Sequence, residues 1–462
     1  MAPSRGELTA VAGASRWQLV AAMTSAGDVW RFRPVVVLRV AIMLMLVAQL
    51  GRIPVLSTGT SEAPLLVNDL CLMAVLASGF LTALVSRSFR LDRVGGIALV
   101  FASVGAISAV LAIPRFGLTT YELIVSLAYL ARWLVYFGVY LVMINVVRAD
   151  DAMSVWRTLE SMILVFSAFG IIQSLFIPHF AQVVYPESRV FVDWDEQGHR
   201  LVSTVLEPNI AGAMIMIVLL VQFAQLAGGE RVPMWKPFLL VAALVATLSR
   251  SSFLGLFVGG LLILAVRGIS RSLMRVGMLV TVISLSALPA LIKYGQNYNK
   301  FTIDESALSR VGSWLRALRV FSDNPTIGIG FNTYGYVQEV YGYTRLGLSS
   351  NSTDGGLLFI AVMTGVVGVS LYLAMLAMVL RRCRRVWRDA GMRPEFRALA
   401  TGIGAATVAV CVHSVFVNSL LTPFVMEPLW ILWALASILA WTIEPAVPDR
   451  PIARITAFKP AT

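Results

Sequence analysis

The sequence predicts an all-α membrane protein, a polytopic bundle of about twelve transmembrane helices with an external cap built from two long loops. Three observations predict it. Hydrophobic residues make up 58% of the 462 residues and charged residues only 13%, whereas a soluble domain carries about a quarter charged residues. Apolar segments of bilayer-spanning length recur along the chain. One short connection between two of them is rich in arginine, as cytoplasmic loops are.

A helix that crosses the hydrocarbon core needs about 20 apolar residues. Twelve segments meet or approach that length: 34–51, 64–84, 94–113, 119–147, 157–177, 207–227, 236–249, 251–267, 275–294, 353–380, 399–419 and 425–443. The seventh and eighth are short and meet at residues 249–252. They are therefore expected to form either two spans or one sharply bent or re-entrant pair.

The distribution of Lys and Arg predicts that both termini are cytoplasmic. With that orientation the cytoplasmic segments hold 24 of the 37 basic residues, and the loop from Arg381 to Arg397 alone holds seven. The predicted organisation is a cytoplasmic segment 1–33, one transmembrane domain 34–443 and a cytoplasmic tail 444–462. External loops 178–206 and 295–352 are much longer than the others, and such loops usually carry function.

Several classes of site are excluded by composition. Three cysteines in or beside apolar runs exclude a disulfide framework. Three histidines argue against a histidine-rich metal site, so no metal and no cofactor is predicted. The net charge of +12 follows the membrane topology, so nucleic acid is not an expected partner.

The second long loop contains an amphipathic helix, Ser306 to Phe321, with Ser306 as a plausible N-cap. Its apolar positions follow helical spacing: Leu308, Val311, Leu315 and Leu318. Trp314 borders this stripe, and three arginines project from the other faces: Arg310, Arg316 and Arg319. They either face a ligand or extend to lipid headgroups, as in an ordinary interfacial helix.

Glycines follow this helix at Gly328 and Gly330, where the backbone can pass close to a ligand. Asp354 lies about one residue inside the next apolar run. It is expected either to cap a transmembrane helix or to accept a proton from a sugar hydroxyl.

The first long loop ends with His199 and Arg200, followed by Glu207-Pro208-Asn209 where the chain re-enters the bilayer. Ionisable groups at that depth are costly and indicate function. The structural alternative is a helix start with Pro in its first turn and Glu as its cap.

Arg250 stands at the external end of a short span. It either extends to the interface from a helix terminus or binds an anion at the mouth of the bundle, where a low dielectric strengthens the attraction. Two further groups of polar residues are interpreted as structural: Asn68, Asp69 and Glu122 within spans, and His179 and His413.

Four segments, taken in order, resemble the O-antigen ligase/polymerase superfamily of bacterial envelope glycan enzymes. They run through about 198–370 and read STVLEPNIAGA, TLSRSSFLGL, SRVGSWLRALRVFSDNPTIGIGFNTYG and NSTDGGLLFIAVMTGVVG. The third is similar to the family's Arg-x3-Trp…Asn-Pro-x-x-Gly-x-Gly signature. Each is loose alone, but four in the right order are fairly specific.

The resemblance implies transfer of a glycan from undecaprenyl diphosphate to an acceptor hydroxyl at the extracytoplasmic face of a bacterial inner membrane, without metal. The diphosphate would be bound by arginine, which donates bidentate hydrogen bonds: Arg250, Arg310 and Arg200, with Arg316 and Arg319 nearby. Trp314, Gly328, Gly330 and Asn209 would belong to the substrate loops. The partners implied are the lipid-linked donor, the glycan acceptor, the bilayer, and a chain-length regulator and flippase.

The sequence departs from the ligases of this superfamily, because Asp354 stands where they carry a histidine. This favours a polymerase for O-antigen, capsule or exopolysaccharide, with Asp354 or Glu207 as the base and His199 as a third candidate. The alternatives are an O-antigen ligase or protein O-oligosaccharyltransferase of the same superfamily, and a polysaccharide flippase. Transporters place charge at the bilayer midplane, whereas here it gathers in the long loops.

Overall fold

The computed structural model of the protein describes residues 54–56, 65–86, 89–184, 198–268, 305–343 and 352–443. These residues form an all-α bundle with one short antiparallel hairpin, β1 (Pro54–Leu56) and β2 (Leu65–Leu66). Its long helices are α4 (Val67–Ser86), α5 (Arg93–Phe116), α6 (Thr120–Val146), α7 (Ala152–Phe176), α10 (Pro208–Ala227), α11 (Trp235–Thr247), α12 (Arg250–Arg267), α16 (Gly356–Arg388), α17 (Pro394–His413) and α18 (Pro423–Trp441).

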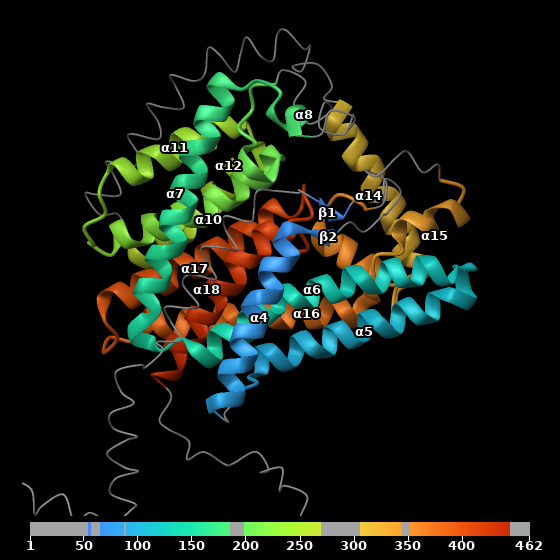
Figure 1. Ribbon diagram of the computed structural model, residues 1–462, viewed down its shortest axis with the longest axis horizontal. Coiled ribbons are helices and arrows are strands. Elements are labelled where there is room, and N and C mark those ends of the chain that lie inside the picture. The colour runs from blue at the N-terminus through green and yellow to red at the C-terminus, as the bar shows by residue number, and fades with distance from the viewer. Residues whose placement is uncertain are drawn as a thin grey trace, which may run out of the picture.

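Shorter elements connect or cover these helices. They are α8 (Phe180–Val184), α14 (Glu305–Asp323), α15 (Tyr334–Val340) and the 3₁₀ turns Ala149–Asp151 and Ser203–Val205. In Figure 1 α14 and α15 lie together at one side of the bundle, next to the end of α5. The amphipathic helix predicted at 306–321 is thus confirmed as α14.

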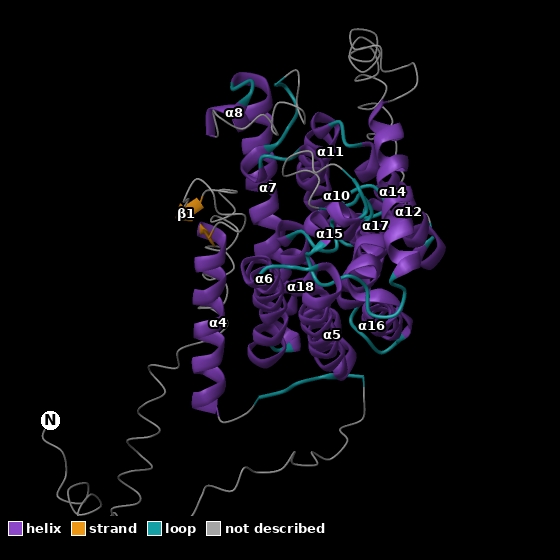
Figure 2. Cartoon of the chain, turned by 90° about the vertical axis from the view of Figure 1, so that its right-hand side faces the viewer, coloured by secondary structure: helices purple, strands orange, loops and turns teal. Residues whose placement is uncertain are grey.

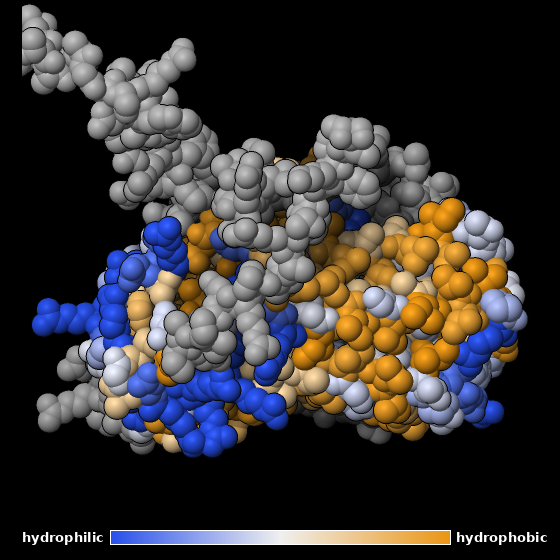
Figure 3. Space-filling view, turned by 90° about the horizontal axis from the view of Figure 1, so that it is seen from below, coloured by the Kyte–Doolittle hydropathy of each residue, from blue (hydrophilic) through white to orange (hydrophobic). Residues whose placement is uncertain are grey.

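Eight of the described helices are long and apolar enough to cross a membrane, and α11 is a shorter apolar helix. Ten predicted spans coincide with described helices. The predicted spans 34–51 and 275–294 lie outside the described residues, so the count of twelve stays a prediction. Figure 3 shows a broad apolar surface with hydrophilic residues gathered toward its two ends, as expected of a protein surrounded by lipid.

The core of the bundle is built on α10 and α18, whose residues are almost all buried. α10 packs against α17 and α12, and α18 packs against α6 and α16. α4 lies at the edge, where it packs on α6 and follows the β1–β2 hairpin (Figure 2). The short segments at 236–249 and 251–267 form two helices, because Leu248 takes a left-handed conformation (φ 53°) that ends α11 before Ser249 begins α12.

α16 is broken at Gly365, whose φ of 67° requires glycine. Residues 325–330 fill the break. Val366 donates its N–H to Pro325 O (2.7 Å), and Ile329 donates to Val362 O (3.0 Å). Non-helical backbone at membrane depth is tolerated only where protein satisfies its polar groups. The loop after α14 is therefore fixed to the membrane helix that follows it.

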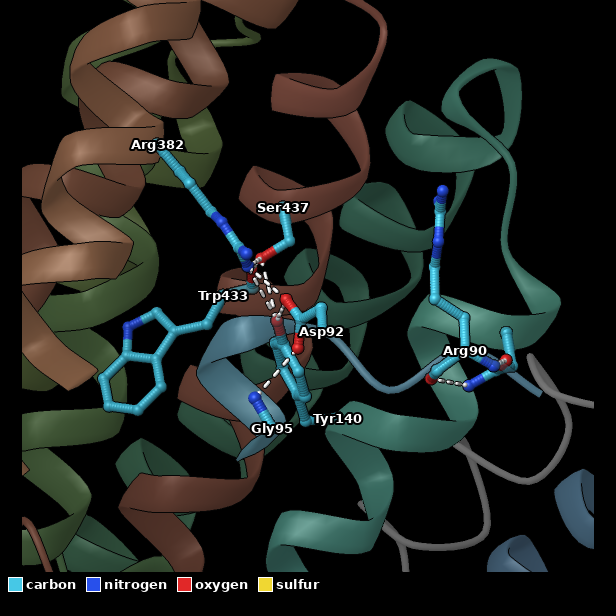
Figure 4. A network of polar contacts seen from close by, with 8 residues as sticks. Arg90, Asp92, Gly95, Tyr140, Arg382, Trp433 and Ser437 are labelled. Carbon is cyan, nitrogen blue, oxygen red and sulfur yellow. Dashed lines mark hydrogen bonds and ion pairs between the residues drawn. The ribbon is translucent and has the colours of Figure 1, made fainter. Parts of the chain in front are cut away.

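The bundle has two chemically different ends. The cap end is where α10, α12, α16 and α18 begin and where α14 lies. The arginine end is where α16 ends and α17 begins. At the arginine end, Arg382 contacts three partners in Figure 4: Asp92 (2.5 Å), Ser437 (2.6 Å) and Tyr140 (2.9 Å). This network joins α16 and α18 to α6 and the start of α5.

Candidate functional site at the cap end

Described segments that are far apart in sequence meet at the cap end. Leu201 donates its N–H to Ala246 O (2.9 Å), which joins the first long loop to α11. Gly212 of α10 is so close to Ser249 and Ser252 that a Cβ would overlap the Ser252 hydroxyl. Gly356 donates its N–H to Ser414 O (2.7 Å), which joins α16 to the end of α17. The helix starts that carry the predicted residues are thus neighbours.

The inward face of α14 differs from the apolar stripe that the sequence indicated. Val311, Leu315 and Leu318 are 45%, 63% and 49% exposed, and they point away from the bundle. Ala317 and Val320 are buried instead, and α14 packs against α16 through this side. In a bilayer protein the most apolar side of a helix can face lipid rather than protein, and that explains the reversal.

Arg310 and Asp354 are brought together on the inward side of α14. Thr353 and Asp354 are held there by Ser313, whose Oγ lies 2.9 Å from Thr353 Oγ1 and accepts from the Asp354 N–H at 3.3 Å. Burial raises the pKa of the Asp354 carboxyl, and the positive charge of Arg310 partly opposes that rise. The pairing leaves a carboxyl that holds a proton more readily than an exposed aspartate does.

Asp354 does not cap α16. The N-cap is Gly355 (φ 94°), which has no side chain with which to cap the helix. Glu207 likewise stands at the N-cap position of α10 without a side-chain cap bond, and Pro208 takes the first helical position as predicted. The structural alternative, in which either carboxyl serves as a helix cap, is therefore not supported.

Trp314 completes the inward face of α14. Its Nε1 would lie 3.5 Å from a Cβ at Gly355, and its ring centre is 6.2 Å from that of Phe416. Phe416 belongs to the turn between α17 and α18. Trp314, predicted as a substrate-loop residue, thus lies between α16 and that turn, and both rings are partly exposed.

Arg250 and Arg200 lie at the α11–α12 turn. Arg250 is exposed in the first turn of α12, where Ser249 is a buried N-cap. Arg200 is half-buried and donates from Nε to Thr247 O at 3.0 Å. Asn209, in the first turn of α10, places its backbone against the His413 ring. All three therefore belong to the same end of the bundle as Arg310 and Asp354.

Four helix starts at the cap end have no side-chain cap bond from their N-cap residue within the part of the chain that the structure describes: those of α10, α12, α16 and α18. Helix N-termini carry free N–H groups and partial positive charge, and they attract anions. Together with Arg250 and Arg310 they give this end an affinity for a multiply charged oxyanion such as a diphosphate.

Other predicted residues lie apart from this group. His199 is exposed, with its ring Nδ1 3.3 Å from Ser174 O. Arg316 and Arg319 are exposed on α14. Burial raises the pKa of the Tyr334 hydroxyl, and a hydrogen bond with Arg316 lowers it, so Arg316 serves the contact between α14 and α15.

Gly328 and Gly330 are required for the packing of the loop 325–330 against α16. Gly328 (φ 72°) lies against the Val362 and Met363 backbone, where a Cβ would overlap. Gly330 donates its N–H to Met363 O (3.1 Å). These glycines fit the loop into the break of α16, and a contact with substrate stays a prediction.

No functional role was predicted for Arg115, Ser313 or Thr353. Arg115 donates to Asn324 Oδ1 (2.5 Å) and to Gly328 O (3.1 Å), and so holds the loop after α14. A lone arginine at a helix end and small hydroxyl residues carry no distinctive pattern. Within the described ranges no three His, Cys, Asp or Glu side chains group as metal ligands do.

Residues 238–373 match the family model described as O-antigen ligase. They form an O-antigen ligase family domain. The domain spans less than a third of the chain and includes α12, α14 and the first part of α16, and so Arg250, Arg310 and Asp354. No curated protein matches the sequence. The chain thus contains a segment similar to O-antigen ligases, set among described helices that are long and apolar enough to cross a membrane.

Proposed function

We propose that the protein is a membrane glycosyltransferase that polymerises oligosaccharide units linked to undecaprenyl diphosphate at the extracytoplasmic face of a bacterial inner membrane. The observation that carries the proposal is the grouping of Arg310, Asp354 and Trp314 within the O-antigen ligase family domain, at the end of the bundle where four described helices start without a side-chain cap bond. In this arrangement cations, a carboxyl group and an aromatic ring share one end of a lipid-embedded bundle.

The donor would bind with its diphosphate at the cap end and its polyprenyl tail in the bilayer. Arg250 and Arg310 would neutralise the diphosphate, a task that a divalent ion performs in many nucleotide-sugar enzymes. Arginine suits it because the guanidinium is always charged and presents several donors in one plane. Preorganised donors of this kind stabilise the charge that grows on a leaving group in the transition state.

The transfer is a substitution at the anomeric carbon of the donor glycan. The acceptor oxygen bonds to that carbon while the bond from the carbon to the phosphate oxygen breaks, and the electron pair leaves with undecaprenyl diphosphate. The acceptor hydroxyl proton moves to a carboxylate, for which Asp354 is the best-placed candidate. A carboxyl with a raised pKa is the stronger base once it is ionised.

Polymerase is preferred to ligase because Asp354 occupies the position at which ligases of the superfamily carry a histidine. A flippase is disfavoured because the group described here lies at helix starts rather than in the middle of interrupted spans.

The test is reconstitution of the full chain in liposomes with lipid-linked oligosaccharide purified from producing cells. The expected product is polymer longer than one repeat unit, formed in the presence of excess EDTA. Arg384→Gln, which removes an exposed arginine at the opposite end, is the charge-matched control and should polymerise normally. Transport of the donor without a new glycosidic bond would contradict the proposal.

Orientation is tested separately. A cysteine introduced at the exposed Glu339 on α15 should react with an impermeable maleimide in intact cells. Labelling only after the membrane is opened would place α14 and α15 in the cytoplasm, and the proposed donor site with them.

A further inference from the structure

The last turns of α16, at the arginine end, carry a stripe of arginines on one face of the helix. Its members are exposed and follow the spacing i, i+3, i+4 and i+7, which places them side by side: Arg381, Arg384, Arg385 and Arg388. The other face of these turns is buried. Cys383 and Val386 are 0% exposed, and Arg382 points into the network of Figure 4. The arginine stripe therefore points away from the bundle.

The same outward face of α16 is apolar in the turns before the arginines. Val366, Val367 and Leu373 are 50%, 42% and 46% exposed, and Ala374 is exposed beside them. Arg381 follows Ala374 after two turns of the helix, on the same side. An exposed apolar face on a helix long enough to span the membrane lies against lipid. The arginine stripe is thus a continuation of the lipid-facing surface of α16.

The length of α16 places the arginine stripe at the edge of the hydrocarbon core. Residues 366–388 rise about 34 Å at about 1.5 Å per residue, slightly more than the core thickness of about 30 Å. At the same end the Trp441 ring centre lies 4.3 Å from the Arg90 guanidinium and 5.7 Å from that of Arg382. Tryptophan gathers at the membrane–water interface, so the stripe lies at the level of the lipid headgroups.

The described part of the protein supplies little negative charge to the stripe. The ion pairs described at this end are made by other basic residues: Lys236, Arg382 and Arg393. The carboxylate of Asp389, which follows the stripe, accepts from the Gly391 N–H. Like charges on neighbouring helical positions repel one another, so anions from outside the bundle would stabilise the end of α16.

We propose that the arginine stripe binds the headgroups of anionic phospholipids in the leaflet that surrounds the end of α16. A guanidinium donates two hydrogen bonds to one phosphate, and basic residues next to the membrane are attracted to acidic lipids. A zwitterionic headgroup is a weaker ligand because its own ammonium group cancels the charge of the phosphate. Lipid is favoured over an acidic protein because the stripe continues a lipid-facing surface.

The inference is independent of the proposed glycosyl transfer, because the stripe lies at the end of the bundle opposite the proposed donor site. Its test therefore measures lipid association and not activity.

The experiment uses the full chain in bilayers of phosphatidylglycerol and phosphatidylcholine in equal parts, with one or the other lipid carrying a spin label on its acyl chain. Electron paramagnetic resonance gives the association constant of each lipid with the protein. The ratio of the phosphatidylglycerol constant to the phosphatidylcholine constant should be about two to five for the wild type. It should approach one in the triple variant Arg381→Gln/Arg384→Gln/Arg388→Gln.

Two controls distinguish the stripe from the overall charge. The triple variant Arg148→Gln/Arg157→Gln/Arg231→Gln removes three exposed arginines of the same end that lie on other segments, and it should keep the wild-type ratio. Salt at about 1 M should lower the wild-type ratio, because it screens exposed charges. This second measurement needs no variant and so does not depend on the folding of one.

The proposal is refuted if both lipids associate equally with the wild-type protein, and an acidic protein would then be the occupant to seek. It is also refuted if the stripe variant keeps the wild-type ratio. An equal loss in the two triple variants would assign the preference to net charge and would likewise overturn the site.

Discussion

Two regions of the bundle, the Arg382 network and the turn between α17 and α18, treat buried polar groups in opposite ways. At the arginine end Arg382 has three side-chain partners, Asp92 is also bonded to the Gly95 N–H, and Tyr140 also lies 3.0 Å from Ser437 (Figure 4). In the turn between α17 and α18, at the cap end, His413 Nε2, Ser414 Oγ and Asn418 Oδ1 have no hydrogen-bond partner among the described residues. A network in which each polar group has a partner fixes helices against one another, whereas a buried polar atom without a partner lowers stability.

The comparison predicts where substitutions act. Changes at the arginine end should lower stability and leave the transfer rate per folded molecule unchanged. Changes at the cap end should do the reverse.

The largest expected effect is on stability, at Arg382. Arg382→Met leaves Asp92 buried without its charge partner, and breaking such a pair costs about 3–5 kcal/mol. Thermal unfolding in detergent should show the loss, and Asp92→Leu combined with Arg382→Met should recover part of it. A single variant as stable as the wild type would show that the network does not hold the helices.

The next effect is on activity, at Arg310. Arg310→Gln should lower polymer formation about 10²- to 10³-fold, the usual cost of removing one preorganised donor from a developing negative charge. The protein should remain folded, because α14 packs through Ala317 and Val320. Transfer at the wild-type rate would remove Arg310 from the donor site.

A smaller loss of stability is expected at Gly365. Gly365→Ala places a Cβ against Thr326 O and requires a left-handed alanine, which alone costs about 1–3 kcal/mol. Gly260→Ala in α12, where a Cβ would meet open space, is the matched control and should not destabilise the protein. Equal unfolding temperatures in the two variants would contradict the inserted loop.

The smallest effect is a displacement of the pH profile. A base must lose its proton to act, and burial raises the pKa of Asp354. Transfer should therefore fall on acidification at a higher pH than for an ordinary aspartate. Transfer rates measured from pH 4 to 8 should show this fall in rate on the acidic side of the profile. Asp354→Asn should abolish the fall together with most of the activity. If the Asp354→Asn variant shows the same fall in rate on acidification, the titrating group is another one, such as Glu207.

Ten of the apolar segments predicted from the sequence coincide with described helices, and eight of those helices are long and apolar enough to cross a membrane. Length and hydropathy determine them. The sequence also predicted α14, and it indicated both Arg310 and Asp354 as candidate site residues. It could not predict which side of α14 meets the bundle, because lipid and protein interior accept the same apolar residues. The apolar residues Val311 and Leu315 therefore suggested the wrong face of α14 as the one that packs on the bundle. The residues that are buried there, Ala317 and Val320, are no more apolar than the residues of the exposed face.

The sequence also did not show whether Asp354 and Glu207 cap the helices that follow them. A carboxyl before an apolar run has the composition of an N-cap, yet Asp354 and Glu207 both leave that role unfilled. The reason is tertiary: Asp354 is held by Ser313, which is 41 residues earlier in the chain.

The loop that enters the break in α16 also constrains biogenesis. Pro325 and Thr326 are synthesised before the helix segment that binds them, so their carbonyls can accept from the N–H groups of Val366 and Val367 only after that segment has followed. The loop and the helix must therefore mature together. A chain arrested between the two would leave a polar backbone facing lipid, a form that quality-control proteases can recognise.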